Sequence, residues 1–388
     1  MHLEGRIDIQ LALHAGAAAT VSIASSRPQL AQKLLAGRTP VEAAHLAGLI
    51  FSLCGKAQRV AAAAACAAAQ GQAPEAAVLH AHEAAVQLES AQEHAWRLLL
   101  DWPQQQGLPP DQASQLRLRQ SAADPQRFAE TLAELLRSTL LGEPAAVWLA
   151  RDLAGFDAWC RAGGTQTARL FAGLAMPAAR KEHLGRRKNE LRGEGADIGI
   201  SQVELLPPLS ALDEATARDL ARRALATPAF CSRPLWRDAP AETGAIARTA
   251  SQPLLAAWIA QRGRGAGARL LARLLELAAL PDPVLESSAG GAPARPPTLV
   301  RAWSLGDNSG LAGVETSRGL LLHVVRLHAD QVAEYRIVAP TEWNFHPAGP
   351  LAQALAQLDS GPGLAAQARL VAQSLDPCVA FAIEVKNA

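Results

Sequence analysis

Two cysteines, Cys54 and Cys378, have the residue type and the settings that could do chemistry in this 388-residue chain. Cys378 follows Asp376-Pro377, and proline both fixes its own backbone angle and keeps the preceding residue out of the helical region. The Cys378 thiol therefore follows a defined bend. If the fold brings it to Cys54, near the N-terminus, the pair forms a soft two-thiolate metal site; if not, both are small buried hydrophobic residues.

The other cysteines lack a comparable setting. Cys66, Cys160 and Cys231 lie in helical or loop contexts without a motif, so we expect them to be core or surface thiols. His94 and the Asp101-Trp102 pair belong to one helical stretch and are expected to pack there. We find no complete set of catalytic residues in the sequence.

The composition excludes several classes of protein. Hydrophobic residues make up 49% of the chain and charged residues 19%, which is typical of a globular protein with a large core. The net charge of +1 indicates neither a nucleic-acid partner nor an anionic membrane surface. Five cysteines without paired spacing argue against a disulfide framework, and the first ten residues lack the apolar segment of a signal peptide. We therefore expect a soluble protein of the cytoplasm.

The elements that must position Cys54 are expected to be a hairpin and helices. Alternating apolar residues over 3–25 predict a β-hairpin, and Thr39-Pro40-Val41-Glu42 is a helix capping box with proline at the first helical position. The helical pattern that follows runs towards Ala69 and includes Cys54, with Gly55 as a weak point. Further helices are predicted over residues 74–102, 124–141, 145–160, 212–226 and 254–280.

The elements that must position Cys378 include strands. Residues 286–297 form a low-complexity segment that we expect to be a flexible surface loop. Beyond it, 320–327 and 331–338 favour strands, and helices resume before Cys378. Because strands lie near both ends, we expect one mainly α domain over residues 1–388 with a small β-sheet built from both termini, an α+β fold. The basic run at 181–192 is expected to be a solvated face, or a docking surface for an acidic partner.

Short motifs follow one another along the whole chain. They are Leu3-Glu4-Gly5-Arg6, Leu35-Ala-Gly-Arg38, Cys54-Gly55, Glu93-His94 to Asp101-Trp102, Glu315-Thr316-Ser317-Arg318-Gly319 with His323, Tyr335 to Asn344, and Asp376-Pro377-Cys378. In order and spacing these motifs resemble those of the large subunit of nickel–iron hydrogenases, and the resemblance implies a large-subunit-like fold.

Departures from the family's two cysteine motifs bear on the activity. In the family, the first cysteine of each motif is a terminal nickel ligand and the second bridges nickel and iron. Here Ala57 and Phe381 replace the second cysteines, and Ala61 and Glu384 replace the histidines that follow them. Two thiolates cannot replace four in a bimetallic centre. The resemblance therefore implies a protein that is not an enzyme and that holds no nickel.

The positions that surround the family's iron ligands are retained. Arg318 matches the arginine beside the cyanide and carbonyl ligands, and Pro340 and Thr341 match the segment whose hydroxyl binds one cyanide. A guanidinium and a hydroxyl can both donate hydrogen bonds to an anionic ligand. Glu4 matches the glutamate beside a terminal cysteine. Here it could assist deprotonation of a thiol or be kept for strand packing.

This combination is similar to the HupK/HoxV type of hydrogenase maturation protein, which looks like a degenerate large subunit. The resemblance implies a scaffold that carries the Fe(CN)2(CO) group on Cys54 and Cys378 before its transfer to the precursor large subunit, with other maturation proteins as partners. One alternative is a metal-free chaperone or placeholder that mimics the large subunit. Another is a divergent metalloenzyme with a mononuclear site.

Overall fold

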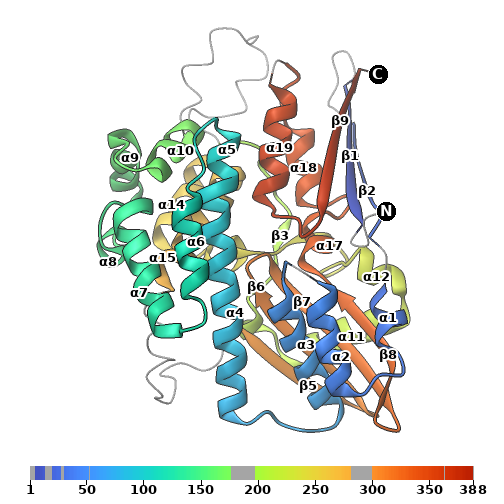
Figure 1. Ribbon diagram of the computed structural model, residues 1–388. Helices are drawn as coiled ribbons and strands as arrows, with labels where there is room; N and C mark the ends of the chain where they lie inside the picture. The colour runs from blue at the N-terminus through green and yellow to red at the C-terminus, as the bar shows by residue number, and fades with distance from the viewer. Residues whose placement is uncertain are drawn as a thin grey trace.

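Helices and three small sheets make up the computed structural model (Figure 1). Four predictions fall outside the residues that it describes: Glu4, the hairpin turn, the basic run at 181–192 and the loop at 286–297. The described residues are 5–13, 20–27, 30–51, 53–175, 197–280, 299–361 and 363–387.

The first sheet joins the two ends of the chain. Strand β1 (Arg6–Leu13) pairs antiparallel with β2 (Thr20–Ser25) and parallel with β9 (Ala380–Asn387), in the order β2-β1-β9. Alternate residues of β1 are buried against helices α18 (Pro350–Ala356) and α19 (Leu364–Ser374). The predicted hairpin is confirmed, and the two ends of the chain do share a sheet, but the C-terminal strand in it is β9, which was not predicted and begins two residues after Cys378.

The second sheet corrects the expectation of a single sheet. Strands β5 (Val300–Gly306), β6 (Ser309–Thr316), β7 (Gly319–His328) and β8 (Gln331–Val338) form a separate antiparallel meander, and β5 was not predicted. Every residue of β6 is buried because α3 (Gly55–Ala69) packs on one face of the sheet and α11 (Glu214–Ala226) on the other. Gly310 has no room for a side chain, since a Cβ there would lie 2.2 Å from the Ala65 carbonyl oxygen.

Helices α2 (Pro40–Ile50) and α3 (Gly55–Ala69) lie over this sheet and correct a second expectation. The capping box at Thr39 is confirmed, but the single helix predicted to run through Cys54 is two helices. They cross in close contact, and a Cβ at Gly55 would lie 2.6 Å from the Gly48 carbonyl oxygen. The break places Cys54 at the residue before the first turn of α3.

The remaining helices form a second half with its own core. Aromatic rings pack together there from α8 (Ala145–Leu149), α9 (Leu153–Ala162), α10 (Gln166–Ala175) and α14 (Pro253–Arg262). The helices predicted over 145–160 and 254–280 are each two helices. Asp152 caps the second helix of the first pair. The buried Asp197 carboxylate accepts hydrogen bonds from backbone N–H groups of Gly265, Gly267 and Ala268, and so caps the second helix of the other. The helices of this half are α4 (Ala76–Trp96), α5 (Trp102–Gln105), α6 (Gln112–Ser121), α7 (Pro125–Leu135), α8 (Ala145–Leu149), α9 (Leu153–Ala162), α10 (Gln166–Ala175), α13 (Ala245–Thr249), α14 (Pro253–Arg262) and α15 (Ala266–Ala279).

Short elements complete the described chain. Strands β3 (Glu204–Leu205) and β4 (Ala241–Glu242) form a two-stranded parallel sheet. The helix predicted over 212–226 is α11 (Glu214–Ala226), which begins two residues later than predicted. Within the described ranges, each helix is too short or too polar to cross a bilayer. Three further α-helices are α1 (Leu30–Leu35), α12 (Pro228–Ser232) and α17 (Pro340–Asn344).

Candidate functional site

The fold brings together the two cysteines that sequence analysis paired. Cys54 precedes α3, and Cys378 lies in the loop before β9. Both thiols are free and half-buried, and Cys378 is close enough to Cys54 to help raise the pKa of the Cys54 thiol. Arg318, in the turn between β6 and β7, acts electrostatically on Cys54. Thr341 contacts Cys378 directly. Glu4, the remaining predicted polar residue, lies outside the described residues.

Helix α17 contacts Cys378 through the side chain of Thr341. Pro340 begins this helix at its first position, and the Thr341 hydroxyl in the same turn donates a hydrogen bond to the Cys378 sulfur at 3.1 Å. The Cys378 N–H approaches the same hydroxyl oxygen at 3.3 Å. Thr341 therefore contacts both the backbone and the thiol of the candidate ligand.

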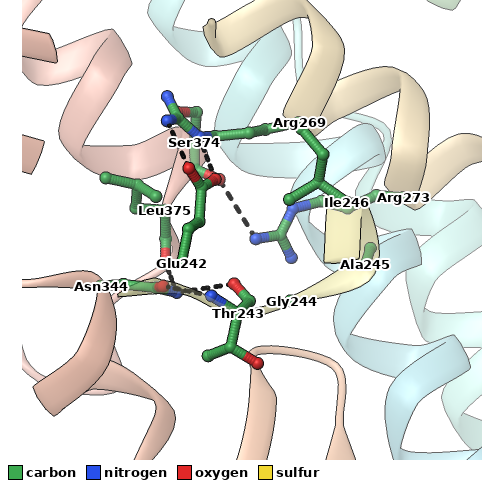
Figure 2. A pocket seen from close by; sticks show the side chains of 10 residues that line it. All are labelled: Glu242, Thr243, Gly244, Ala245, Ile246, Arg269, Arg273, Asn344, Ser374 and Leu375. Carbon is green, nitrogen blue, oxygen red and sulfur yellow. Dashed lines mark hydrogen bonds and ion pairs between the residues drawn. The ribbon is translucent and has the colours of Figure 1, made fainter. Parts of the chain in front are cut away.

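Asn344, at the end of α17, ties the loop before Cys378 to β4 (Figure 2). Its side-chain amide donates to the carbonyl oxygens of Thr243 at 3.0 Å and Leu375 at 3.5 Å, and its oxygen accepts from the Thr243 N–H at 3.0 Å. A small cavity lies beside this contact and is lined by polar groups that already pair with one another, such as Glu242 and Arg269. These contacts fix the approach of the chain to Cys378.

Asp376 bends the chain just before Cys378 and is fully buried. Its backbone is left-handed, with φ of +54°, and its carboxylate forms ion pairs with Arg97 at 2.5 Å, Arg273 at 2.9 Å and Arg318 at 3.5 Å. Burial alone would raise the pKa of Asp376, but these three guanidinium groups hold it below its usual value. The backbone of Asp376 thus forms the turn before Cys378, and its carboxylate pairs with Arg318.

Arg318 has donors left over. Its Nη2 donates to Glu93 at 2.6 Å, and its backbone N–H donates to the Thr316 hydroxyl. Burial opposes its charge, but the carboxylates of Asp376 and Glu93 and the two thiols raise the pKa of Arg318 above its usual value. Within the described chain, its Nη1 is buried without a hydrogen-bond partner, while its Nε faces Asp376 only through the 3.5 Å ion pair. Such orphaned donors favour an anionic ligand at this point.

A buried chain of hydrogen bonds orients the groups around Cys54. The Gln58 amide nitrogen donates to the Cys54 sulfur at 3.6 Å, and its oxygen lies 2.8 Å from His323 Nε2. That oxygen can only accept, so Nε2 carries the proton, and Nδ1 accepts from the Tyr335 hydroxyl at 2.7 Å. Burial lowers the pKa of His323 to about 3, which keeps the ring neutral in this role.

Burial keeps the Cys54 thiol protonated, and Glu89 contributes to this. A thiol at the start of a helix is usually acidified by the exposed N–H groups, but Glu89 of α4 accepts from those of Lys56 at 2.7 Å and Ala57 at 3.3 Å. Burial raises the pKa of Cys54 to about 12, and Cys378 and Glu89 add to the rise while Arg318 and Gln58 oppose it. The free thiol is therefore neutral at pH 7, and a bound metal must displace its proton.

Several residues near the thiols were not predicted from the sequence: Gln58, Glu89, the role of Asp376, and Arg27, a largely buried cation that follows β2 and pairs with Glu342. Neither Gln58 nor Glu89 stands out in the sequence, because both have polar neighbours, such as Arg59 and Ser90. Within the described ranges, no three His, Cys, Asp or Glu side chains are arranged to hold a metal ion. The site thus offers two thiols surrounded by hydrogen-bond donors, rather than a complete ligand set.

Comparison with curated proteins matches this chain along nearly its whole length. It is 32% identical to the hydrogenase expression/formation protein HoxV of Cupriavidus necator, over 93% of this chain and 92% of that protein. It is 30% identical to HupK of Rhizobium leguminosarum bv. viciae, over 99% and 97%. The chain belongs to the HupK/HoxV family of hydrogenase expression/formation proteins. Members with these names establish a role in hydrogenase maturation at the level of the family.

The fold of this HupK/HoxV family member is also found in hydrogenases themselves. The family model for nickel-dependent hydrogenase matches residues 298–384, which include Arg318, Thr341 and Cys378. A solved chain of the Ni-Fe-Se hydrogenase from D. vulgaris Hildenborough superposes with a TM-score of 0.52 and 13% identity, over 94% of each chain. The one from Desulfomicrobium baculatum gives 0.52 and 14%, also over 94% of each. The predicted α+β, large-subunit-like fold is confirmed.

Proposed function

We propose that this protein is a maturation scaffold that carries the Fe(CN)2(CO) group on Cys54 and Cys378 and passes it to the precursor of a nickel–iron hydrogenase large subunit. The observation that carries the proposal is that two half-buried thiols lie with Arg318 and Thr341. The iron group is cargo in this scheme. No bond of a substrate is made or broken by the protein, so it is not an enzyme.

The donor set supports this cargo. Two thiolates are soft ligands, and the remaining positions of the iron are filled by its own carbonyl and cyanide ligands. The orphaned Arg318 donors can bind a cyanide nitrogen, as the Thr341 hydroxyl can once it turns from the Cys378 sulfur. A site with only two protein ligands also favours release, which a carrier requires.

The residues at the replaced positions argue against a second metal. Ala57 is fully buried in α3, and Phe381 packs beside α19 with Arg369 over its ring. Neither side chain has a lone pair to bridge two metals. Glu384, where the resemblance places a histidine, lies on the exposed face of β9 and pairs with Lys386 at 3.1 Å. These positions support a site for iron alone, without nickel.

The partners that follow from this proposal are other hydrogenase maturation proteins, which deliver the iron group, and the precursor large subunit, which receives it. All of them act in the cytoplasm in this scheme. Neither nucleic acid nor a membrane takes part.

Cysteine variants in cells that lack the natural gene test the proposal. We expect Cys54→Ala and Cys378→Ala to abolish hydrogenase maturation and to purify anoxically without iron. Cys231→Ala is the matched control, because that buried thiol lies in an apolar cluster and its nearest acceptor is the Ala224 carbonyl oxygen at 3.9 Å. Normal maturation with both candidate ligands replaced would contradict the carrier and favour the metal-free placeholder.

A further inference from the structure

Arg27 is a second cation beside the two thiols. It follows β2, and the exposed fraction of its side chain is 13%. Its Nη1 donates to Glu342 at 2.7 Å, and Glu342 stands next to Thr341 in the first turn of α17. Burial opposes the charge of Arg27, but the Cys378 thiol, Glu342 and Cys54 raise its pKa above the usual value. Arg27 thus lies within electrostatic reach of both thiols, as Arg318 does.

The backbone around Arg27 is closely built. The Ser26 N–H donates to the Arg6 carbonyl oxygen at 2.9 Å, and the Ser26 hydroxyl accepts from the Arg6 N–H at 3.0 Å. Gly5 passes so close that a Cβ there would lie 2.6 Å from the Arg27 Cα, and its φ of +71° also favours glycine. The end of the hairpin therefore holds Arg27 in a defined place beside α17.

We propose that Arg27 is a binding residue for an anionic ligand at the thiols, and that together with Arg318 it flanks the carried iron group with two guanidinium ions. This inference deepens the proposed function and rests on it. Glu342 keeps Arg27 in position, and so couples it to the helix turn that carries Thr341.

The charge of the cargo explains why a second cation is useful. Ferrous iron with two cyanides is neutral and carbonyl adds no charge, so two coordinated thiolates leave the whole group negative. Arg318 already shares its charge with Glu93 and Asp376. A planar guanidinium has five donors, so Arg27 can keep its bond to Glu342 and still donate to a cyanide nitrogen. Arg27 and Arg318 would then bind different ligands of one iron.

The alkylation rates of Cys378 with two reagents test this without the cargo. Iodoacetate is an anion and iodoacetamide is neutral, and peptide mass spectrometry gives the rate of each at Cys378 in anoxic protein. We expect Arg27→Met to lower the ratio of the iodoacetate rate to the iodoacetamide rate roughly tenfold, because one nearby cation is lost. Any change in the thiolate fraction alters both rates equally and cancels in the ratio, so the ratio isolates the effect of the cation on the anionic reagent, and an unchanged circular dichroism spectrum shows that the fold is kept.

Two further variants separate binding from a merely structural ion pair. Glu342→Gln removes the partner but keeps the cation, so the ratio should hold or rise. Arg151→Met breaks a comparable half-buried pair with Glu143 in the helical half and should leave the ratio unchanged. A ratio that stays within twofold of wild type in Arg27→Met, or that falls equally in Glu342→Gln, overturns the inference.

The proposed function fails by a different result. If wild-type protein from cells that make the cofactor shows no cyanide or carbonyl infrared bands, the carrier is lost whatever the alkylation ratio. If the bands are present but keep their positions and intensities in Arg27→Met, the carrier stands and the role of Arg27 is overturned. We expect the bands to weaken severalfold and the cyanide bands to shift in that variant.

Discussion

The core of the helical half and the surroundings of the two thiols are built from different side chains. In the helical half, aromatic rings pack mostly edge to face, with centroids 5.3 to 6.4 Å apart. Such contacts add to the burial of large apolar surfaces, so this core is explained by stability alone. Its rings are those of Trp148, Phe156, Trp159, Phe171 and Trp258.

Around the thiols the interior is charged. Asp376 and three arginines are buried together, and Arg318 keeps donors without partners among the described residues. Buried ion pairs contribute little to stability because desolvation costs about as much as the attraction returns. Stability alone therefore does not explain the thiol region, which supports the proposal that it places two thiols and holds an anion beside them.

The largest loss of stability is expected in the aromatic core. Phe156→Ala removes a ring that contacts four others and should lower the free energy of unfolding by about 4 kcal/mol, measured by urea denaturation. The iron bound per folded molecule should not change, since the ring is remote from the thiols. Loss of iron from the folded fraction would break the comparison between the two regions.

Asp376→Asn tests the charged region itself. Asparagine also accepts a left-handed backbone, so the change removes charge without altering the turn. We expect the free energy of unfolding to fall by about 3 kcal/mol, because three buried guanidinium groups lose their shared carboxylate. Iron binding should also be lost.

A matched exposed pair serves as the control for that variant. Asp219 pairs with Arg222 and Arg223, but its side chain is 44% exposed, so Asp219→Asn should cost under about 1 kcal/mol. Equal effects of the two substitutions would show that the buried cluster has no special role.

Two groups near the thiols, His323 and Glu89, contribute to the pH dependence of stability with opposite signs. His323, with its pKa lowered to about 3, stays neutral while an unfolded histidine gains a proton below pH 6.5, so its contribution is lost as the pH falls. Glu89, whose pKa burial raises to about 7, binds its proton first in the folded state, so its contribution grows as the pH falls towards 4.5. In wild type the two slopes nearly cancel.

Glu89→Gln should expose the slope of His323. Between pH 6.5 and 5, the free energy of unfolding should fall by about 1 kcal/mol per pH unit more than in wild type, as measured by urea denaturation at each pH. An unchanged slope would contradict the burial of Glu89 at the start of α3.

Among the variants around the thiols, the smallest effect on stability is expected at the contact between Thr341 and Cys378. Thr341→Val keeps the shape but removes the hydroxyl, which should cost about 1 kcal/mol. We also expect weaker iron binding and a shifted cyanide band in infrared spectra of the loaded protein. A cyanide band at the wild-type position would show that the hydroxyl does not contact the ligand.

Sequence reasoning identified the parts of the site that lie in retained motifs. Cys54, Arg318, Thr341 and Cys378 stand at positions whose order matches a known family, and the fold does bring them together. The hairpin of β1 and β2 was also predictable from its alternating pattern, but the strand that joins it from the C-terminal end, β9, was not predicted.

The sequence could not reveal the contacts that join distant segments. Arg27 and Glu342 are 315 residues apart, and neither belongs to a local pattern that indicates an ion pair. The break before Cys54 was missed because alanine and leucine continue the helical pattern on both sides. It follows from the close crossing of α2 and α3 at Gly48 and Gly55, a tertiary contact that overrides local propensity.

The most direct test is an infrared spectrum of protein purified anoxically from cells with the complete hydrogenase maturation system, beside Cys54→Ala and Cys378→Ala. If Cys54 and Cys378 carry the iron group, we expect cyanide and carbonyl bands in wild type that vanish in both variants. Their absence from wild type, in cells where hydrogenase maturation still depends on the protein, would contradict the carrier and leave the metal-free chaperone.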